Sequence, residues 1–211
     1  KAASDFTRAA VRDGAQLVLM PENVSMIEAG RANIISKAMP EETHAALAAF
    51  RALAAELGIW IHCGSLAVSL PNGKVANRTY VADPKGDVAA KYDKIHMFDV
   101  DLGNGERYAE SATFDPGNKA ALVDLPWGRL GLTICYDLRF PGLYRHLAQA
   151  GADYLTVPSA FTRPTGEAHW HVLLRSRAIE TGCFVFAPAQ TGEHAGGRKT
   201  YGHSQIGRAH V

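Results

Sequence analysis

One cysteine of the sequence stands where an apolar run gives way to polar residues and turn formers. Cys135 follows the apolar residues 130–134 and precedes Asp137 and Pro141, two residues typical of the start of a helix. A sharp turn from a strand to a helix exposes a side chain and leaves backbone N–H groups free to stabilise an oxyanion. From this spacing alone, Cys135 is equally well a nucleophile or a buried, unreactive thiol.

A nucleophilic thiol needs a base or a nearby cation, because an ordinary cysteine with a pKa of about 8.5 is mostly protonated at neutral pH. Glu22 follows the apolar run "LVLMP", so we expect a carboxylate at the end of a buried strand. Partial desolvation there would raise its pKa and make it a usable base. Lys94, in "KYDKIHMFD", would lower the pKa of a thiol and bind the charge of a tetrahedral intermediate. Taken singly, each is better explained as an ordinary surface charge, but their joint appearance at strand ends favours a reactive site.

Helix-like and strand-like segments alternate along the chain, which is typical of an α/β fold. The segment 59–68 is predicted to form one buried strand, and turns at "PNGK" and "PKGD" predict a hairpin meander after it, so the sheets should be mixed. Helices are expected near residues 1–14, 41–58, 142–151 and 167–182, and further strands near 75–84, 88–93, 120–137, 153–159 and 183–189.

Two short segments resemble each other: "GAQLVLMPE", ending at Glu22, and "GADYLTVPS", ending at Ser159. Each has Gly-Ala, an apolar strand and then a proline. This order of glycine, apolar strand and proline can recur by chance in any α/β protein. Alternatively, the two are related half-units whose strand ends deliver Glu22 and Ser159 to one shared cleft.

The bulk composition limits the function classes. The 211 residues are 47% hydrophobic and fit a single domain over 1–211. The 22 Lys and Arg nearly balance the 21 Asp and Glu, so nucleic acid is not an expected partner, and no apolar run reaches the length of a membrane span.

Cys63, Cys135 and Cys183 are widely spaced and odd in number, which favours a reducing, cytoplasmic location, and Cys63 and Cys183 are expected to be unreactive. The chain starts at Lys1 without a methionine and ends in "IGRAHV", so we expect a fragment truncated at both ends, with residues 206–211 not native.

Three stretches of the sequence resemble the signature regions of the nitrilase superfamily of carbon–nitrogen hydrolases: "LMPENV", "KYDKIHMFDVDL" and "GLTICYDLRFPGLYRHLAQAGADYLTVPSAF". The resemblance extends from "GAQLVLMPE" to "TYGHSQ". It implies a four-layer α-β-β-α sandwich and a Glu-Lys-Cys triad at Glu22, Lys94 and Cys135. It also implies a further carboxylate, at Glu110, that supports the lysine and the substrate.

The later stretch "PSAFTRPTGEAHWHVLLRSRAIETGCFVFAPAQTGEH" resembles the amidase branch that includes deaminated-glutathione amidase and ω-amidase, with "APAQTGEH" more similar to the former. This implies hydrolysis of a small amide through a cysteine thioester, with no metal or organic cofactor, and it disfavours a nitrile substrate. Glu22 would be the general base, and Lys94 and the Tyr136 N–H would hold the oxyanion. Related amidases act on acids that carry a carboxylate, so Arg139, Ser159 and Arg163 are candidate substrate contacts.

Other functions remain open at this stage. The substrate could be α-ketoglutaramate, as for ω-amidase, or an N-carbamoyl or other amide of the same superfamily. A metal hydrolase would use Glu167, His169 and His171, although residues two apart on a helix point to different faces. A non-catalytic family member is the third possibility. The helices near 142–151 and 168–180 carry enough apolar residues to predict a homodimer or a larger homo-oligomer, and missing strands would leave open edges and poor solubility.

Overall fold

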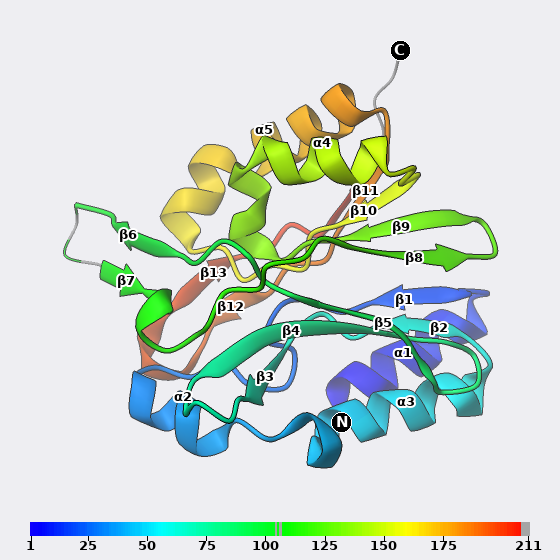
Figure 1. Ribbon diagram of the computed structural model, residues 1–211, viewed down its shortest axis with the longest axis horizontal. Coiled ribbons are helices and arrows are strands. Elements are labelled where there is room, and N and C mark those ends of the chain that lie inside the picture. Colours follow the sequence, from blue (N-terminus) through cyan, green and yellow to red (C-terminus); the bar gives the residue numbers. More distant parts are fainter. Residues whose placement is uncertain (104, 106, 208–211) are drawn as a thin grey trace.

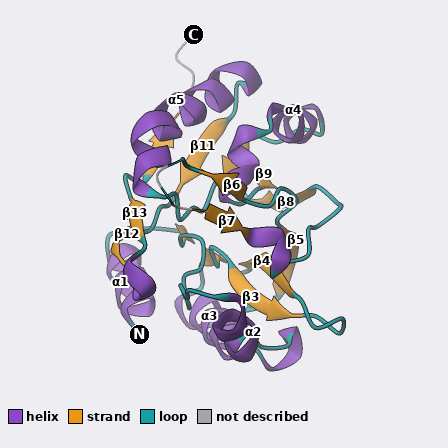
Figure 2. Cartoon of the chain, turned by 90° about the vertical axis from the view of Figure 1, so that its left-hand side faces the viewer, coloured by secondary structure: helices purple, strands orange, loops and turns teal. Residues whose placement is uncertain are grey.

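The computed structural model describes residues 1–103, 105 and 107–207. Two β-sheets pack face to face, with α4 and α5 covering one outer face and α1 and α3 the other (Figure 1). The expected four-layer α-β-β-α sandwich is therefore confirmed. Figure 2 shows the same layers from the end at which two short strand pairs, β6–β7 and β12–β13, lie.

The first sheet is built from the N-terminal half of the chain. Strand β1 pairs in parallel with β2, β4 pairs antiparallel with both β2 and β3, and β5 pairs with β4 as a meander. This is the mixed sheet that the turn sequences predict. The elements of this half are α1 (Ala2–Arg12), β1 (Leu17–Leu19), α2 (Arg31–Lys37), a 3₁₀ turn (Glu41–Thr43), α3 (Ala45–Leu57), β2 (Trp60–His62), β3 (Leu66–Ser69), β4 (Val75–Ala82) and β5 (Val88–Asp93).

The prediction of one strand over 59–68 is wrong, because the chain breaks between β2 and β3. Ile61 pairs with Ala82 and Leu66 with Arg78, so the β2–β3 side carries one residue more than β4 opposite it. Gly64 lies in this break at φ +64°, and a Cβ there would stand 2.0 Å from the carbonyl oxygen of Pro21. The break thus lets the segment that leads to Glu22 lie directly against the sheet.

The second sheet has the order β14-β11-β10-β9-β8, with β9, β10 and β11 parallel and an antiparallel strand at each edge. Its strands and helices are β8 (Ala121–Leu125), β9 (Gly128–Leu132), η3 (Cys135–Arg139, a 3₁₀ turn), α4 (Pro141–Gln149), β10 (Tyr154–Thr156), α5 (Arg163–Thr181), β11 (Phe184–Ala187) and β14 (Gln205–Gly207). The remaining elements are β6 (Asp99–Asp101), β7 (Arg107–Ala109), η2 (Glu110–Ala112, a 3₁₀ turn), β12 (Thr191–Glu193), η4 (Ala195–Gly197, a 3₁₀ turn) and β13 (Lys199–Tyr201). Of the six residues 206–211, the first two pair in β14, and 208–211 lie outside the described residues.

Helix α3 illustrates how the sequence determines these elements. Its apolar side chains recur at helical spacing, and Leu47, Phe50 and Ala54 are buried against the first sheet. His44 accepts a hydrogen bond from the amide of Leu47 at the N-terminus, and Gly58 ends the helix in the left-handed conformation. The expected helix and its glycine cap are therefore confirmed.

The largest apolar cluster fills the space between the two sheets and beneath α4 and α5. It includes Leu130, Leu155 and Val185 from parallel strands and Tyr144 and Trp170 from the helices. This packing fixes the ends of β9 and β10, from which the reactive segments emerge. Among the described helices, none combines the length and apolar character that crossing a bilayer requires.

Candidate active site

The three residues of the expected triad meet at one cavity, although they lie far apart in sequence. Glu22 follows β1, Lys94 follows β5 and Cys135 follows β9, and all three line a cavity of about 960 Å³. The two sheets pack face to face (Figure 1), and residues that follow strands of both sheets line this cavity.

Lys94 is the centre of the charged cluster. Its Nζ lies 3.2 Å from Oε1 of Glu22 and 3.0 and 2.9 Å from the two carboxylate oxygens of Glu110. Burial alone would lower the pKa of Lys94, but Glu110, Glu22 and the Cys135 sulfur outweigh it and raise that pKa. Lys94 is therefore an ammonium ion. Glu110 also accepts a hydrogen bond of 2.6 Å from the amide of Phe98, which fixes its carboxylate beside the lysine.

Glu22 is ionised at rest, contrary to the expected rise in its pKa. Burial does act to raise the pKa, but Lys94, a hydrogen bond from Cys135 and the nearby charge of Arg198 together lower it. The carboxylate also accepts hydrogen bonds from Asn77 Nδ2 at 2.9 Å and from the amide of Ala160 at 2.8 Å. The position of Glu22 at a strand end predicted only its desolvation. Its hydrogen-bonding and charged partners could not be predicted, because they come from segments that only the fold brings together.

Cys135 occupies the left-handed region at φ +49°, and its amide donates to the carbonyl of Pro158 at 3.0 Å. Its thiol lies within hydrogen-bonding reach of the Glu22 carboxylate. Burial and the Glu22 charge raise the pKa of Cys135, and Lys94 lowers it by less. As expected, Lys94 acts to lower the pKa of the thiol, but burial and Glu22 outweigh it, so the resting thiol is protonated and lies beside a carboxylate that can take its proton.

Asp137 holds the turn that carries Cys135. The side chain is fully buried, and Oδ2 accepts hydrogen bonds from the amide of Ile134 at 2.8 Å and from Tyr92 Oη at 2.7 Å. Oδ1 lies 3.0 Å from the amide nitrogen of His96 and 2.7 Å from His96 Nδ1. Since Tyr92 and His96 flank Lys94, this one carboxylate ties the Lys94 segment to the Cys135 turn. The sequence marked Asp137 only as a helix-start residue.

The expected substrate contacts are only partly at the cavity. Arg163 and Tyr136 both line the cavity, and Arg163 is exposed. Within the described residues, no acceptor is bonded to the backbone N–H of Tyr136. Arg139 does not line the cavity, because its guanidinium contacts His169 at 3.1 Å and lies by aromatic rings. Ser159 is fully buried and donates to the carbonyl of Val157, so its hydroxyl is not available to a ligand in the cavity.

The two resembling segments do converge, but through the backbone rather than through Ser159. The Glu22 carboxylate that follows the first segment accepts its hydrogen bond from Ala160, the residue after the second segment. The interpretation that both strand ends reach one site is therefore correct, and the side chain assigned to the second one is not.

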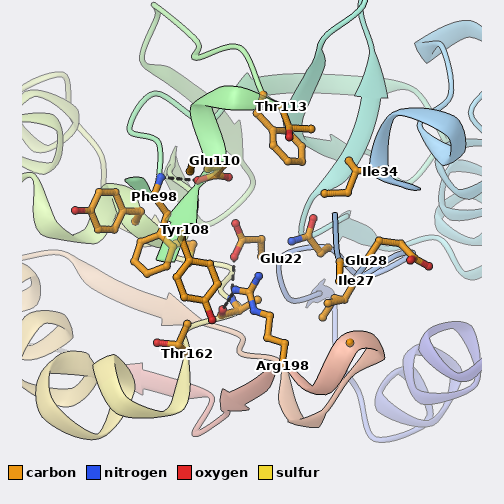
Figure 3. A pocket seen from close by; sticks show the side chains of 18 of the residues that line it. Glu22, Ile27, Glu28, Ile34, Phe98, Tyr108, Glu110, Thr113, Thr162 and Arg198 are labelled. Atoms are coloured by element: carbon orange, nitrogen blue, oxygen red, sulfur yellow. Dashed lines mark hydrogen bonds between the residues drawn. The ribbon is translucent and has the colours of Figure 1, made fainter. Parts of the chain in front are cut away.

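Several lining residues were not identified from the sequence. Phe98 and Tyr108 lie on one side of the cavity, and Ile27 and Ile34 lie on the other (Figure 3). Arg198 lies beside Glu22, and its Nη2 donates to the carbonyl of Ala160 at 2.6 Å. The only local signal for Arg198 is its place after two glycines in "GGRKTYGHSQ", which gives no hint of the cavity.

The histidines of "EAHWH" do not converge on a metal site. Helix α5 includes this stretch, as the apolar spacing predicts, and it sends His169 to Arg139 and His171 to Tyr201 and Gln205. No cluster of three His, Cys, Asp or Glu side chains suited to a metal was found among the residues that the structure describes.

Known proteins similar to this chain were found in sequence and in structure. The family model for carbon-nitrogen hydrolases matches residues 1–209. A Yersinia enterocolitica protein named deaminated glutathione amidase is 43% identical over 197 residues, which are 92% of this chain and 68% of that protein. The crystal structure of the C. elegans NitFhit protein matches with a TM-score of 0.90 and 38% identity, over 97% of this chain and 50% of that one. A mutant amidase from Nesterenkonia sp., with the acetamide moiety of fluoroacetamide added covalently at its active-site cysteine, matches with a TM-score of 0.81 and 27% identity, over 97% of this chain and 74% of that one.

Proposed function

The chain belongs to the carbon–nitrogen hydrolase family, and on that premise we propose that it hydrolyses a small carboxyamide, such as deaminated glutathione, through a thioester on Cys135. The observation that carries the proposal is that Cys135, Glu22 and Lys94 line one cavity, with the thiol within hydrogen-bonding reach of Glu22 and the Lys94 ammonium in contact with the same carboxylate. The Yersinia relative supports this substrate by its name. A cavity of about 960 Å³ also has room for a leaving group larger than ammonia.

In the first half-reaction, the Cys135 sulfur attacks the amide carbonyl carbon while its proton passes to Glu22. The oxyanion that forms is bound by the Lys94 ammonium and the Tyr136 N–H. When this intermediate collapses, the C–N bond breaks and Glu22 returns the proton to the leaving nitrogen. A neutral amine or ammonia departs and a thioester remains.

In the second half-reaction, Glu22 takes a proton from water as the water oxygen attacks the thioester carbonyl. Collapse of the second intermediate breaks the C–S bond, the acid leaves, and the sulfur recovers its proton from Glu22. Glu110 keeps Lys94 in place through both steps by its two contacts to Nζ.

The test compares Cys135→Ala and Cys135→Ser with wild type on deaminated glutathione and on α-ketoglutaramate. We expect the alanine variant to lose turnover by at least about 1,000-fold, while its melting temperature stays near that of wild type. Cys183→Ala serves as the control, since the Cys183 thiol is buried and bonded to the carbonyl of Ala152. Retained turnover in Cys135→Ala, or inactivation by a chelator rather than by iodoacetamide, would disprove the proposal. Faster turnover of α-ketoglutaramate would reassign the substrate to that of an ω-amidase.

We also propose that the protein is a cytoplasmic homodimer or larger homo-oligomer. Val172 and Ile179 are 66% and 67% exposed on α5, beside α4, and such an apolar face favours a subunit contact. All three cysteines are unpaired, in keeping with a reducing compartment. Light scattering of wild type and Ile179→Glu tests the assembly: equal masses, both monomeric, would contradict it.

A further inference from the structure

The described part of the cavity wall carries more positive than negative charge. Six cationic side chains line it against three carboxylates, whereas the chain as a whole has a net charge of only +1. The cations are Arg31, Lys94, Arg107, Arg163, Arg198 and Lys199, and the carboxylates are Glu22, Glu28 and Glu110. A concave site with this excess attracts anionic ligands.

Besides Lys94, Arg198 is the other cation of the cavity wall whose charge acts on Glu22. It lies beside Glu22 and Tyr108 in the cavity (Figure 3). The peptide unit of Ala160 connects them: its carbonyl accepts from Arg198 Nη2, and the amide of the same residue donates to Glu22 and lies within hydrogen-bonding reach of the Cys135 sulfur. One residue's backbone therefore separates the guanidinium from the nucleophile.

The hydrogen bonds of Arg198 leave much of its guanidinium unused. Within the described residues, no carboxylate lies within 4.0 Å of it, and its buried Nε has no hydrogen-bond partner. Arg107 and Lys199, by contrast, each pair with a surface acid, at 3.2 and 3.7 Å. A guanidinium has five N–H donors, and a buried polar group without a partner in a functional cleft points to a ligand that supplies one.

We propose that Arg198 binds a carboxylate on the acyl half of the substrate and thereby selects monoamides of dicarboxylic acids. This inference rests on the proposed amidase activity of the same site. In a five-carbon monoamide, the scissile carbonyl carbon and the carboxylate carbon are about 5 Å apart, which suits a cation one residue's backbone away from the thiol. The acyl half stays on Cys135 after the amine has left, so Arg198 would hold it through both half-reactions.

The experiment uses three amides with acyl chains of five carbons that differ in whether and on which half they carry a carboxylate. Glutaramate has it on the acyl half, pentanamide has a methyl group in its place, and N-pentanoylglycine has it on the leaving half. We expect wild type to prefer glutaramate, and Arg198→Met to lower kcat/KM for glutaramate by about 10- to 100-fold, the usual effect of losing a charged hydrogen bond. Loss of the charge beside Glu22 should lower the values for pentanamide and N-pentanoylglycine as well, but by a smaller and equal factor, so the preference for glutaramate over pentanamide should fall by about 10-fold. Arg198→Lys should recover only part of the loss, because it keeps the charge without the planar fork.

Each alternative outcome has a distinct meaning. An equal fall for all three amides would show that Arg198 acts through Ala160 and Glu22, and a selective fall for N-pentanoylglycine would move the bound carboxylate to the leaving half; either result overturns the inference. Unchanged kinetics in Arg198→Met overturns it as well. Wild type that hydrolyses none of the three amides or deaminated glutathione would instead refute the proposed function. Arg145→Met, which removes an exposed arginine on α4, is the matched control.

Discussion

Replacing Asp137 by asparagine should disturb the site without touching any group that reacts. The carboxylate has four hydrogen-bonding contacts: the amide of Ile134 and Tyr92 Oη at one oxygen, and the amide and the ring nitrogen of His96 at the other. An asparagine side chain has nearly the same shape, but one of its two ends is an NH₂ group that can only donate. The change therefore tests the hydrogen bonds and not the packing.

The magnitude follows from the two backbone partners. The hydroxyl of Tyr92 can rotate to become an acceptor, but the amides of Ile134 and His96 cannot. Whichever way the asparagine turns, its NH₂ faces one of these amides and leaves a buried donor unsatisfied, and the other oxygen loses its charge. Each loss costs about 1–3 kcal/mol, so the free energy of unfolding should fall by about 2–5 kcal/mol. For a chain of this size, that lowers the melting temperature by roughly 5–15 °C.

Activity should fall as well, because Asp137 connects the Lys94 segment to the Cys135 turn. A displacement of about 1 Å between catalytic groups costs about 100-fold, and we expect kcat/KM to drop by that order in Asp137→Asn. The assay combines thermal unfolding, amide hydrolysis below the melting temperature and the rate of Cys135 alkylation by iodoacetamide. Asp124→Asn is the control, since this exposed acid pairs with Arg129 at the surface. A melting temperature within 2 °C of wild type, together with normal kcat/KM, would refute the assignment of Asp137 as the clamp of the turn.

Three further predictions concern groups around the site. Glu110→Gln removes one of the two carboxylates that hold Lys94, so it should cost about 3 kcal/mol of unfolding free energy in urea titrations and lower kcat, and unchanged kcat would contradict the supporting role. Burial lowers the pKa of His62 from 6.5 to about 4. Between these two pH values, His62 is protonated in the unfolded chain but stays neutral in the folded chain. Stability should therefore fall by about 3 kcal/mol between pH 7 and pH 4, and urea titrations of His62→Gln should lose that part of the pH dependence. Gly64→Ala places a Cβ 2.0 Å from the carbonyl of Pro21 at a positive φ, so we expect a melting temperature at least 5 °C lower and weakened activity; a normal melting temperature would show that the strand break relaxes freely.

Local patterns were enough to predict a mixed α/β fold and the turn at Cys135, and the resemblance to a known family implied the four layers. The apolar spacing of α3, the glycine after it and the proline at the start of α4 are all signals within a few residues of the structure that they specify. The resemblance to a known family carried Glu22 and Lys94 to the same site as Cys135, and the structure places all three at one cavity. Such predictions succeed because each depends on a segment read by itself.

The remaining features depend on contacts between distant segments. Ser159 stands at a strand end, yet its hydroxyl turns back to its own strand, because only the packing of β10 decides which way it points. The break at Gly64 lies against Pro21, and Arg198 is hydrogen-bonded to Ala160 in the cavity, and both partners are distant in sequence. The directions of the pKa shifts of Glu22 and Cys135 are sums over partners from several elements, so no single stretch of sequence determines them.

These protonation states explain how a neutral thiol suits the proposed chemistry. At rest, the buried cluster holds two carboxylates, Glu22 and Glu110, and one ammonium, Lys94. When Cys135 attacks and its proton reaches Glu22, the negative charge leaves that carboxylate and reappears on the oxyanion, while Lys94 is released from one of its two partners. The net charge of the cluster does not change during the step. In a buried site, the creation of a new charge has a large free-energy cost, whereas the movement of an existing charge by a few ångströms beside a fixed cation has a small one. A pre-formed thiolate would therefore bring no advantage here.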